Sequence, residues 1–197
     1  ISVNASIANS SVQLGNNTIS VTSIVDASGQ NSPTNEIPSD INLFVNEKPN
    51  ASLTISKNEI CDGDSVNLIF NILKGTAPFN VDYTINATSQ TPILFSSNGA
   101  QIFSLNNPKP IIGTNSYQII SISDINGCTN STASPIVNLN VNDIPIIDIA
   151  ISGKNPICLG DSSEISFPIF KGAAPFSVVY NDGTNSYNVT VDNNGLI

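Results

Sequence analysis

The sequence predicts an all-β protein built from tandem repeats of about 97 residues. The composition supports strands, because the chain has 29 Asn, 27 Ser and 13 Thr, while charged residues make up only 11%. Uncharged polar residues of this kind are poor helix formers. Hydrophobic residues reach 40%, which is enough for a packed core. Short apolar alternations separated by turn residues fill each repeat, as is typical of strands and hairpins.

A duplicated segment carries the repeat prediction. Residues 57–83 and 154–180 align without a gap at an offset of 97, and 16 of the 27 positions are identical. Residues 15–29 match 113–127 at an offset of 98, and residues 45–49 match 141–145 at an offset of 96. Self-similarity at one fixed period indicates a repeat architecture.

The repeat boundaries follow from these alignments. We expect residues 1–46 to be the C-terminal part of one repeat, 47–143 to be a complete repeat, and 144–197 to be the N-terminal part of the next. The pattern Asn-acid-x-Pro marks each junction. Because both ends of the sequence fall inside repeats, we expect the chain to be a segment of a longer tandem array.

The central repeat predicts about seven short strands. Val66, Leu68, Phe70 and Ile72 alternate and fall on one face of a strand. Asn98-Gly99 is a hairpin signal. The expected strands, in chain order, are 51–56, 65–73, 79–85, 92–95, 101–105, 116–123 and 136–141. Seven short strands in about 97 residues favour an immunoglobulin-like β-sandwich.

Two tyrosines are candidates for features of such a sandwich. Tyr117, at the start of the sixth strand, is placed to form a tyrosine corner. Tyr83 is the nearest aromatic candidate for the core position that Trp usually fills, since the chain has no Trp.

Several residue types are missing, and their absence excludes function classes. The chain has no His, Arg or Met, and its net charge is −9. A nucleic-acid partner is excluded because it requires a cationic face. Without His, the commonest general base and metal ligand are absent, so we expect no enzyme, no cofactor and no metal site. No apolar run is long enough to span a bilayer, so we expect no membrane insertion.

Three motifs resemble those of a known repeat family. They are Cys-x-Gly-Asp-Ser at 61–65 and 158–162, Gly-x-Ala-Pro-Phe at 75–79 and 172–176, and the segment from Tyr117 to Thr129 that contains Asp124 and Gly127. They resemble SprB-type repeats, which are tandem immunoglobulin-like or PKD-like modules of large Bacteroidota surface adhesins. That family includes gliding-motility adhesins exported by type IX secretion.

The resemblance implies a function and a location. We expect a structural rod or filament segment of a secreted, tandem-repeat adhesin at the cell surface. The expected partners are neighbouring repeats of the same polypeptide and, through a distal region, surface polysaccharide or other cells. The alternative is a non-catalytic module of a secreted polysaccharide-degrading enzyme. Direct glycan binding by the repeats is a third option, but an exposed aromatic platform is not evident.

The three cysteines are candidates for disulfides, given an extracellular β-module. Cys61 precedes the second strand and Cys128 follows the sixth, and these two strands run in the same direction in an immunoglobulin-like sandwich. The two cysteines should therefore lie at opposite ends of the module. We expect Cys61, Cys128 and Cys158 to pair with cysteines of neighbouring repeats; free thiols or a bridge within the module stay open.

Three further features have a functional and a purely structural interpretation. Asp64-Ser65-Val66 resembles an O-glycosylation motif of Bacteroidota, although Ser65 also suits the start of a strand. Acidic residues at turns, including Asp62 and Asp124, could bind calcium, but their spacing matches no calcium loop. The repeated Lys-Gly-x-Ala-Pro-Phe could be a binding loop, and the stronger interpretation is a packed turn.

Overall fold

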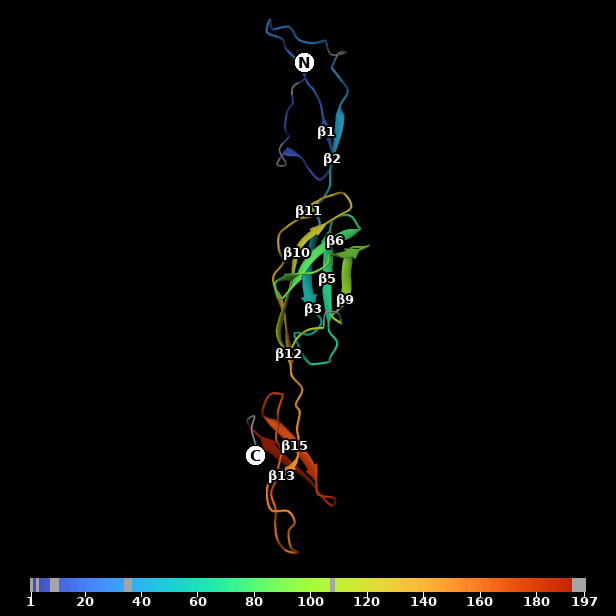
Figure 1. Ribbon diagram of the computed structural model, residues 1–197. Helices are drawn as coiled ribbons and strands as arrows, with labels where there is room; N and C mark the ends of the chain where they lie inside the picture. Colours follow the sequence, from blue (N-terminus) through green and yellow to red (C-terminus); the bar gives the residue numbers. More distant parts are fainter. Residues whose placement is uncertain (1, 3, 8–10, 34–36, 107–108, 193–197) are drawn as a thin grey trace.

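The structure is a computed structural model, and it describes residues 2, 4–7, 11–33, 37–106 and 109–192. Figure 1 shows three β bodies in a row, with the N-terminus at one end of the row and the C-terminus at the other. The central body lies between the two segments that contain the chain termini. No helix in the described part of the chain is long and apolar enough to cross a membrane.

The central module is a sandwich of two sheets. One sheet contains β3 (Asn50–Ile55), β5 (Asn67–Lys74) and β9 (Gly99–Ser104), with β5 in the middle. The other has the order β4 (Glu59–Cys61), β12 (Val137–Asn142), β10 (Gly113–Ser123), β6 (Phe79–Ile85) and β7 (Thr88–Ser89). Two further strands extend this second sheet: β8 (Ile93–Phe95) pairs with β6, and β11 (Thr129–Asn130) pairs with β10.

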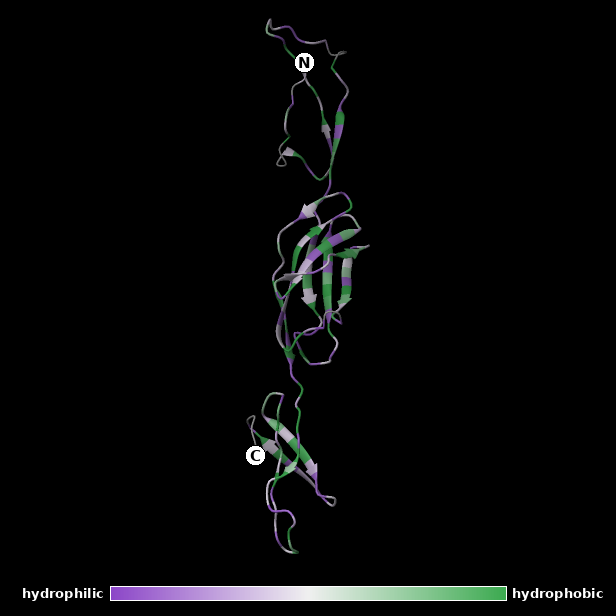
Figure 2. Cartoon of the chain, in the orientation of Figure 1, coloured by the Kyte–Doolittle hydropathy of each residue, from purple (hydrophilic) through white to green (hydrophobic). Residues whose placement is uncertain are grey.

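Alternating apolar residues from the two sheets fill the core of this module. Leu68, Phe70 and Ile72 of β5 are at most 1% exposed, as the period of two predicts. Tyr83 from β6 lies edge-on to Phe70, with ring centroids 5.9 Å apart, and so takes the aromatic core position. Figure 2 shows hydropathy alternating along these strands. The prediction of an all-β, immunoglobulin-like sandwich is confirmed; the number of repeats stays a prediction.

The N-terminal segment has the same strand pairing as the edge of the central module. β1 (Gly15–Ile19) is antiparallel to β2 (Ile41–Val45), with Gly15 opposite Val45. In the central module, β10 and β12 pair with Gly113 opposite Val141, which is the same register after the repeat offsets. The segment from Asp26 to Gly29 also forms the same turn as its counterpart from Asp124 to Gly127.

The C-terminal segment has the strands of the first half of a module. β13 (Ala150–Ile151) pairs with β14 (Ile165–Ser166), and β15 (Phe176–Asn181) pairs with β16 (Ser186–Val191). A small core links them, formed by Phe167, Ile169, Phe176, Val178 and Val191. β13 and β14 are much shorter than their counterparts β3 and β5.

Most predicted strands occur in the structure within two residues of their predicted ends, which is the ordinary uncertainty of strand boundaries. The sequence did not predict β4, β7 or β11. Each of these strands has only two or three residues, too few to show an alternation. β4 is defined by its parallel pairing with β12, about 80 residues further along the chain.

Candidate functional site: the module junctions

The first junction is a short linker that lies on a loop of the central module. Pro49 is fully buried, and a Cβ added at Gly75 would lie 2.8 Å from the Pro49 Cβ and 3.0 Å from the Phe79 ring. Gly75 also has φ +95°, a conformation that a side chain disfavours. Only glycine therefore lets the linker approach the loop this closely.

The second junction repeats this arrangement. A Cβ added at Gly172 would lie 2.9 Å from the Pro145 Cα and 3.1 Å from the Phe176 ring. Gly172 has φ +90°, close to the value at Gly75. The loop formed by the repeated Lys-Gly-x-Ala-Pro-Phe motif is thus the surface on which the linker proline packs. This agrees with the interpretation as a packed turn.

An ion pair accompanies each of these contacts. Lys74 Nζ lies 2.6 Å from Glu47 Oε1, and Lys171 Nζ lies 3.6 Å from Asp143 Oδ2. All four side chains are partly exposed, so each pair contributes at most about 1 kcal/mol to stability. The two pairs are therefore a minor part of each junction beside the buried contact of the proline.

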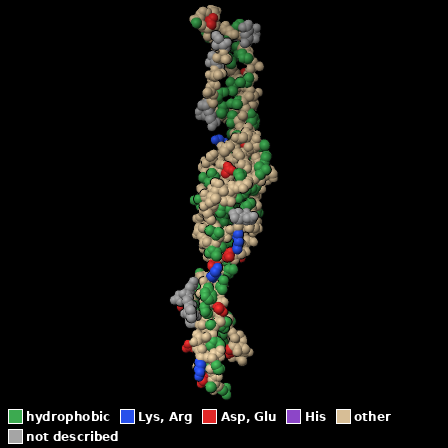
Figure 3. All heavy atoms as spheres, in the orientation of Figure 1, with side chains coloured by type: hydrophobic (Ala, Val, Ile, Leu, Met, Phe, Trp, Pro, Cys, Tyr) green, Lys and Arg blue, Asp and Glu red, His purple; other side chains and the backbone are tan. Residues whose placement is uncertain are grey.

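The second junction also brings charges of two modules together. Lys109 Nζ lies 2.6 Å from Asp62 Oδ1, and this hydrogen bond lowers the pKa of the Asp62 carboxyl. The charge of Lys171, which belongs to the next module, lowers the same pKa further. Figure 3 shows basic and acidic side chains gathered at the narrow segment between the central and C-terminal bodies. The charges of Asp62 in the central module and Lys171 in the C-terminal segment therefore interact across the junction.

Asp124 fastens the linker-binding loop to the rest of the central module. This carboxylate is 8% exposed and accepts hydrogen bonds from the backbone N–H groups of Thr76 (3.1 Å), Asn126 (3.0 Å) and Cys128 (3.0 Å). Ile125 N–H donates in return to the Thr76 carbonyl at 3.2 Å. The loop that receives Pro49 is thus held by a turn almost fifty residues further along the chain.

The structure shows the three predicted disulfide residues as free thiols. Cys61 lies beside Asn142, near the Gly113 end of β10, while Cys128 follows the Ser123 end of that strand. Eleven residues of strand separate the two ends, or roughly 30 Å, whereas a disulfide needs Cα atoms within about 7 Å. A bridge within the module is therefore excluded. Bridges to cysteines of other repeats stay a prediction.

The remaining candidate residues belong to turns. Ser65 is exposed just before β5, so it is accessible, and nothing near it indicates modification. Asp64 accepts a hydrogen bond from the Cys61 N–H at 3.1 Å, and Asp161 does the same for Cys158 at 3.2 Å. The Cys-x-Gly-Asp motif is therefore a turn closed by its own aspartate. No group of three or more His, Cys, Asp or Glu side chains within the described ranges could hold a metal ion.

The partner of the repeated loop was not predicted from the sequence. The junction motif Asn-acid-x-Pro and the loop motif were interpreted separately, although both recur in both repeats. Pro49 precedes Gly75 by 26 residues, and Pro145 precedes Gly172 by 27. This nearly constant separation was a signal that the two motifs are in contact.

The fold and the junctions together define a protein of tandem immunoglobulin-like modules. No known family profile matches the chain. Over 175 residues the chain is 31% identical to the nucleoporin POM152 of Saccharomyces cerevisiae, and the match covers 86% of this chain and 13% of that protein. The chain therefore spans about an eighth of the length of this curated relative.

This similarity corrects two expectations from the sequence. A nucleoporin is neither a secreted surface adhesin nor a module of a secreted enzyme, so the expected function and the expected extracellular location are wrong. The reason lies in the motifs on which both expectations rested. Cys-x-Gly-Asp closes a turn and Gly-x-Ala-Pro-Phe receives a linker, so these motifs report the fold and its junctions rather than a cellular location.

Proposed function

We propose that the chain is a non-catalytic, structural segment of a longer protein of the nucleoporin type, in which immunoglobulin-like modules act as spacers of fixed orientation. The similarity to a nucleoporin supports the class of assembly. The repeated junction contact supports the mechanical role, because the same proline–glycine contact and the same kind of ion pair recur at both junctions. Its partners are the neighbouring modules of the same polypeptide.

The repeated proline–glycine contact is the observation that carries this proposal. The residues of a flexible linker between independent modules are exposed and make no specific packing contact with either module. Here Pro49 is fully buried and its ring occupies the space that a side chain at position 75 would need. Because Pro49 directly precedes β3, this contact fixes the direction in which the linker enters the central module.

Small-angle X-ray scattering tests the mechanical role. We expect the monomeric chain to scatter as an extended particle with a narrow distribution of maximum dimensions. Gly75→Val should displace Pro49 and broaden that distribution, because the new side chain occupies the place of the linker. Gly99→Val is the matched control, since Gly99 has a similar φ of +92° and nothing within 4 Å of its Cβ position. Equal broadening by both variants contradicts a fixed junction.

The location is tested separately, in the cells that produce the protein. A fluorescent tag on the full-length protein should give a signal at the nuclear pores. A signal at the outer cell surface or in the medium contradicts the assignment to a nucleoporin-type protein, and it leaves the result for junction rigidity unchanged.

A further inference from the structure

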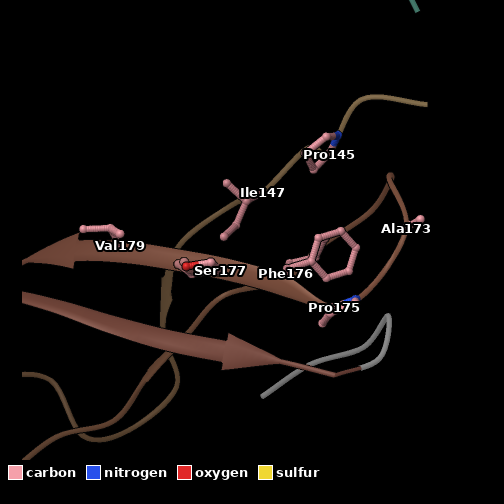
Figure 4. A pocket seen from close by; sticks show the side chains of 9 residues that line it. Pro145, Ile147, Ala173, Pro175, Phe176, Ser177 and Val179 are labelled. Atoms are coloured by element: carbon pink, nitrogen blue, oxygen red, sulfur yellow. The ribbon is translucent and has the colours of Figure 1, made fainter. Parts of the chain in front are cut away.

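The central module has strands in both sheets of the sandwich, so its edges show which surfaces a module leaves open. The apolar groove between Pro145, Ile147 and Phe176 (Figure 4) lies instead in the C-terminal segment, whose described residues form the strands of half a module. The exposure of this groove therefore indicates no partner. On the central module an open edge is found at β9, on the side of the body between the two ends where the linkers attach (Figure 1).

The backbone of β9 is unpaired along this edge. One side of β9 pairs with β5, and no strand lies on its other side in the described part of the chain. The Leu105 N–H donates to the Val66 carbonyl, so the odd-numbered residues turn their backbone groups toward β5. Those of Ala100, Ile102 and Ser104 point to the open edge, where the Ser104 carbonyl alone accepts a hydrogen bond from another described residue. Such a row of backbone groups is a template for a further strand.

The other edges of the sandwich are short, charged or covered. β4, β7, β8 and β11 have only two or three residues each. Glu59 lies in β4, and Asp62 directly follows it. β3 contacts β10 and β12 of the facing sheet. β9 has six residues and contains neither a charge nor a proline, so it lacks the features with which proteins usually prevent pairing at an edge.

The side chains around this edge are apolar and uncharged. Ile102 is 69% exposed and Leu94 of β8 is 71% exposed, the two highest values among the large apolar side chains described in the central module. No charged residue occurs from 83 to 108. The chain has a net charge of −9, which keeps copies apart over most of their surface. Electrostatic repulsion between two copies is therefore smallest where both present this uncharged edge.

We infer that β9 of one copy pairs antiparallel with β9 of a second copy, so that the two three-stranded sheets join into one continuous sheet. Two identical strands paired in this way are related by a two-fold axis, and the contact closes as a dimer. The modules would then associate side by side, and the linkers at their ends stay free of the contact. This inference goes beyond the proposed function and does not depend on it.

The apolar residues on the outer face of the sheet set the register. Thr54 lies opposite Ile69, and Ile69 lies opposite Ile102, so the three residues form one row across the sheet. When Ile102 lies opposite Ile102 of the second copy, this row continues across the dimer and the two isoleucines contact each other. Each Ile102 N–H then donates to the Ile102 carbonyl of the other copy, and Ala100 lies opposite Ser104.

Sedimentation equilibrium of the full chain tests the association. We expect a mass that rises from 20.7 kDa toward twice that value as the concentration increases. Ile102→Lys should weaken the dimer about tenfold or more, because it places two like charges opposite each other. Ile136→Lys is the matched control, since it makes the same change at a side chain that is 58% exposed just before β12, in the other sheet. A constant mass of 20.7 kDa, or an equal effect of both variants, overturns the inference.

The distance between two spin labels tests the geometry of the pair. In a chain with Cys61→Ser, Cys128→Ser and Cys158→Ser, Thr54→Cys provides one exposed label site on β3. From β3 to β3 of the second copy the joined sheet has five strand spacings of about 4.8 Å, or about 24 Å in all. Pulsed electron paramagnetic resonance should detect this short distance between copies, and adding Ile102→Lys should remove it. A distance centred beyond about 40 Å, or one that persists with Ile102→Lys, overturns the inference.

Discussion

The carboxylate of Asp124 lies 3.1 Å from the backbone nitrogen of Thr76, and this hydrogen bond joins the turn after β10 to the loop before β6. The same loop receives Pro49 through Gly75. A single buried carboxylate therefore connects the module core to the junction, and it does so through a backbone N–H that only a proline at position 76 would remove.

Asp124→Ala should destabilise the central module by about 3 kcal/mol, because three backbone N–H groups lose a charged acceptor in a nearly buried site. Urea unfolding monitored by tyrosine fluorescence measures the effect. The matched control is Asp26→Ala, which removes the same turn contacts to Ser28 and Gln30 in the N-terminal segment. If both variants unfold at the same urea concentration, the contact to the loop has no role in stability.

Gly75→Ala should cost about 3 kcal/mol or more, because the added Cβ would lie 2.8 Å from a Pro49 carbon and the backbone has φ +95°. Gly99→Ala bears the backbone strain alone and should cost about 1 to 2 kcal/mol, since nothing lies within 4 Å of its Cβ position. Thermal unfolding of the two variants gives the difference. A cost at Gly75 no larger than that at Gly99 would mean that the linker moves aside freely.

The central module should lose stability above pH 10. Burial raises the pKa of Tyr117 to about 12 and raises that of Tyr83 above its usual value. The unfolded chain ionises its tyrosines near pH 10, so the stabilisation is present below pH 10 and is lost as the pH rises toward 12. For Tyr117 the loss amounts to about 2 to 3 kcal/mol.

Denaturant unfolding between pH 9 and pH 12 measures this loss, and Tyr117→Phe should reduce it. The variant keeps the buried ring, which is 1% exposed, and removes the ionisable group. An unchanged alkaline transition in Tyr117→Phe would assign the whole effect to other groups. The Tyr117 hydroxyl forms no hydrogen bond with another described residue, so the expected tyrosine corner is not present among these residues.

All three cysteines should react with a thiol reagent in the native chain. Cys61 and Cys158 are exposed and should react fast, while Cys128 is half-buried and should react more slowly. Mild oxidation of the dilute chain should leave its thermal unfolding unchanged, because Cys61 and Cys128 lie at opposite ends of β10. An intrachain disulfide found by peptide mapping would contradict this geometry.

The sequence predicted those parts of the fold that depend on local patterns. The alternation from Val66 to Ile72 located β5, and the run from Phe79 to Ile85 is β6 with its observed ends. The alignment of residues 15–29 with 113–127 pairs Asp26 with Asp124, and the two residues form the same turn. In each case the information lies within about ten neighbouring residues.

The site was harder to predict because its contacts join distant parts of the chain. The loop motif was correctly assigned to packing, but the contact of Gly75 with Pro49 depends on a linker 26 residues earlier. β4 is defined by its pairing with β12, about 80 residues further along the chain. The function was predicted wrongly because turn and packing motifs specify a fold that many kinds of protein share.

The parallel pairing of β4 with β12 has a mechanical consequence. β12 continues directly into the linker at Asp143, whereas β4 is connected through β3 to the linker at Pro49. Tension applied along the row of modules would pull these two strands in opposite directions. The bonds between them, from Asp62 N–H to the Asn142 carbonyl (2.8 Å) and from Asn140 N–H to the Asn58 carbonyl (2.9 Å), lie across the direction of pull. They would be loaded in shear and would break together instead of one after another, so the module resists stretching up to a threshold force.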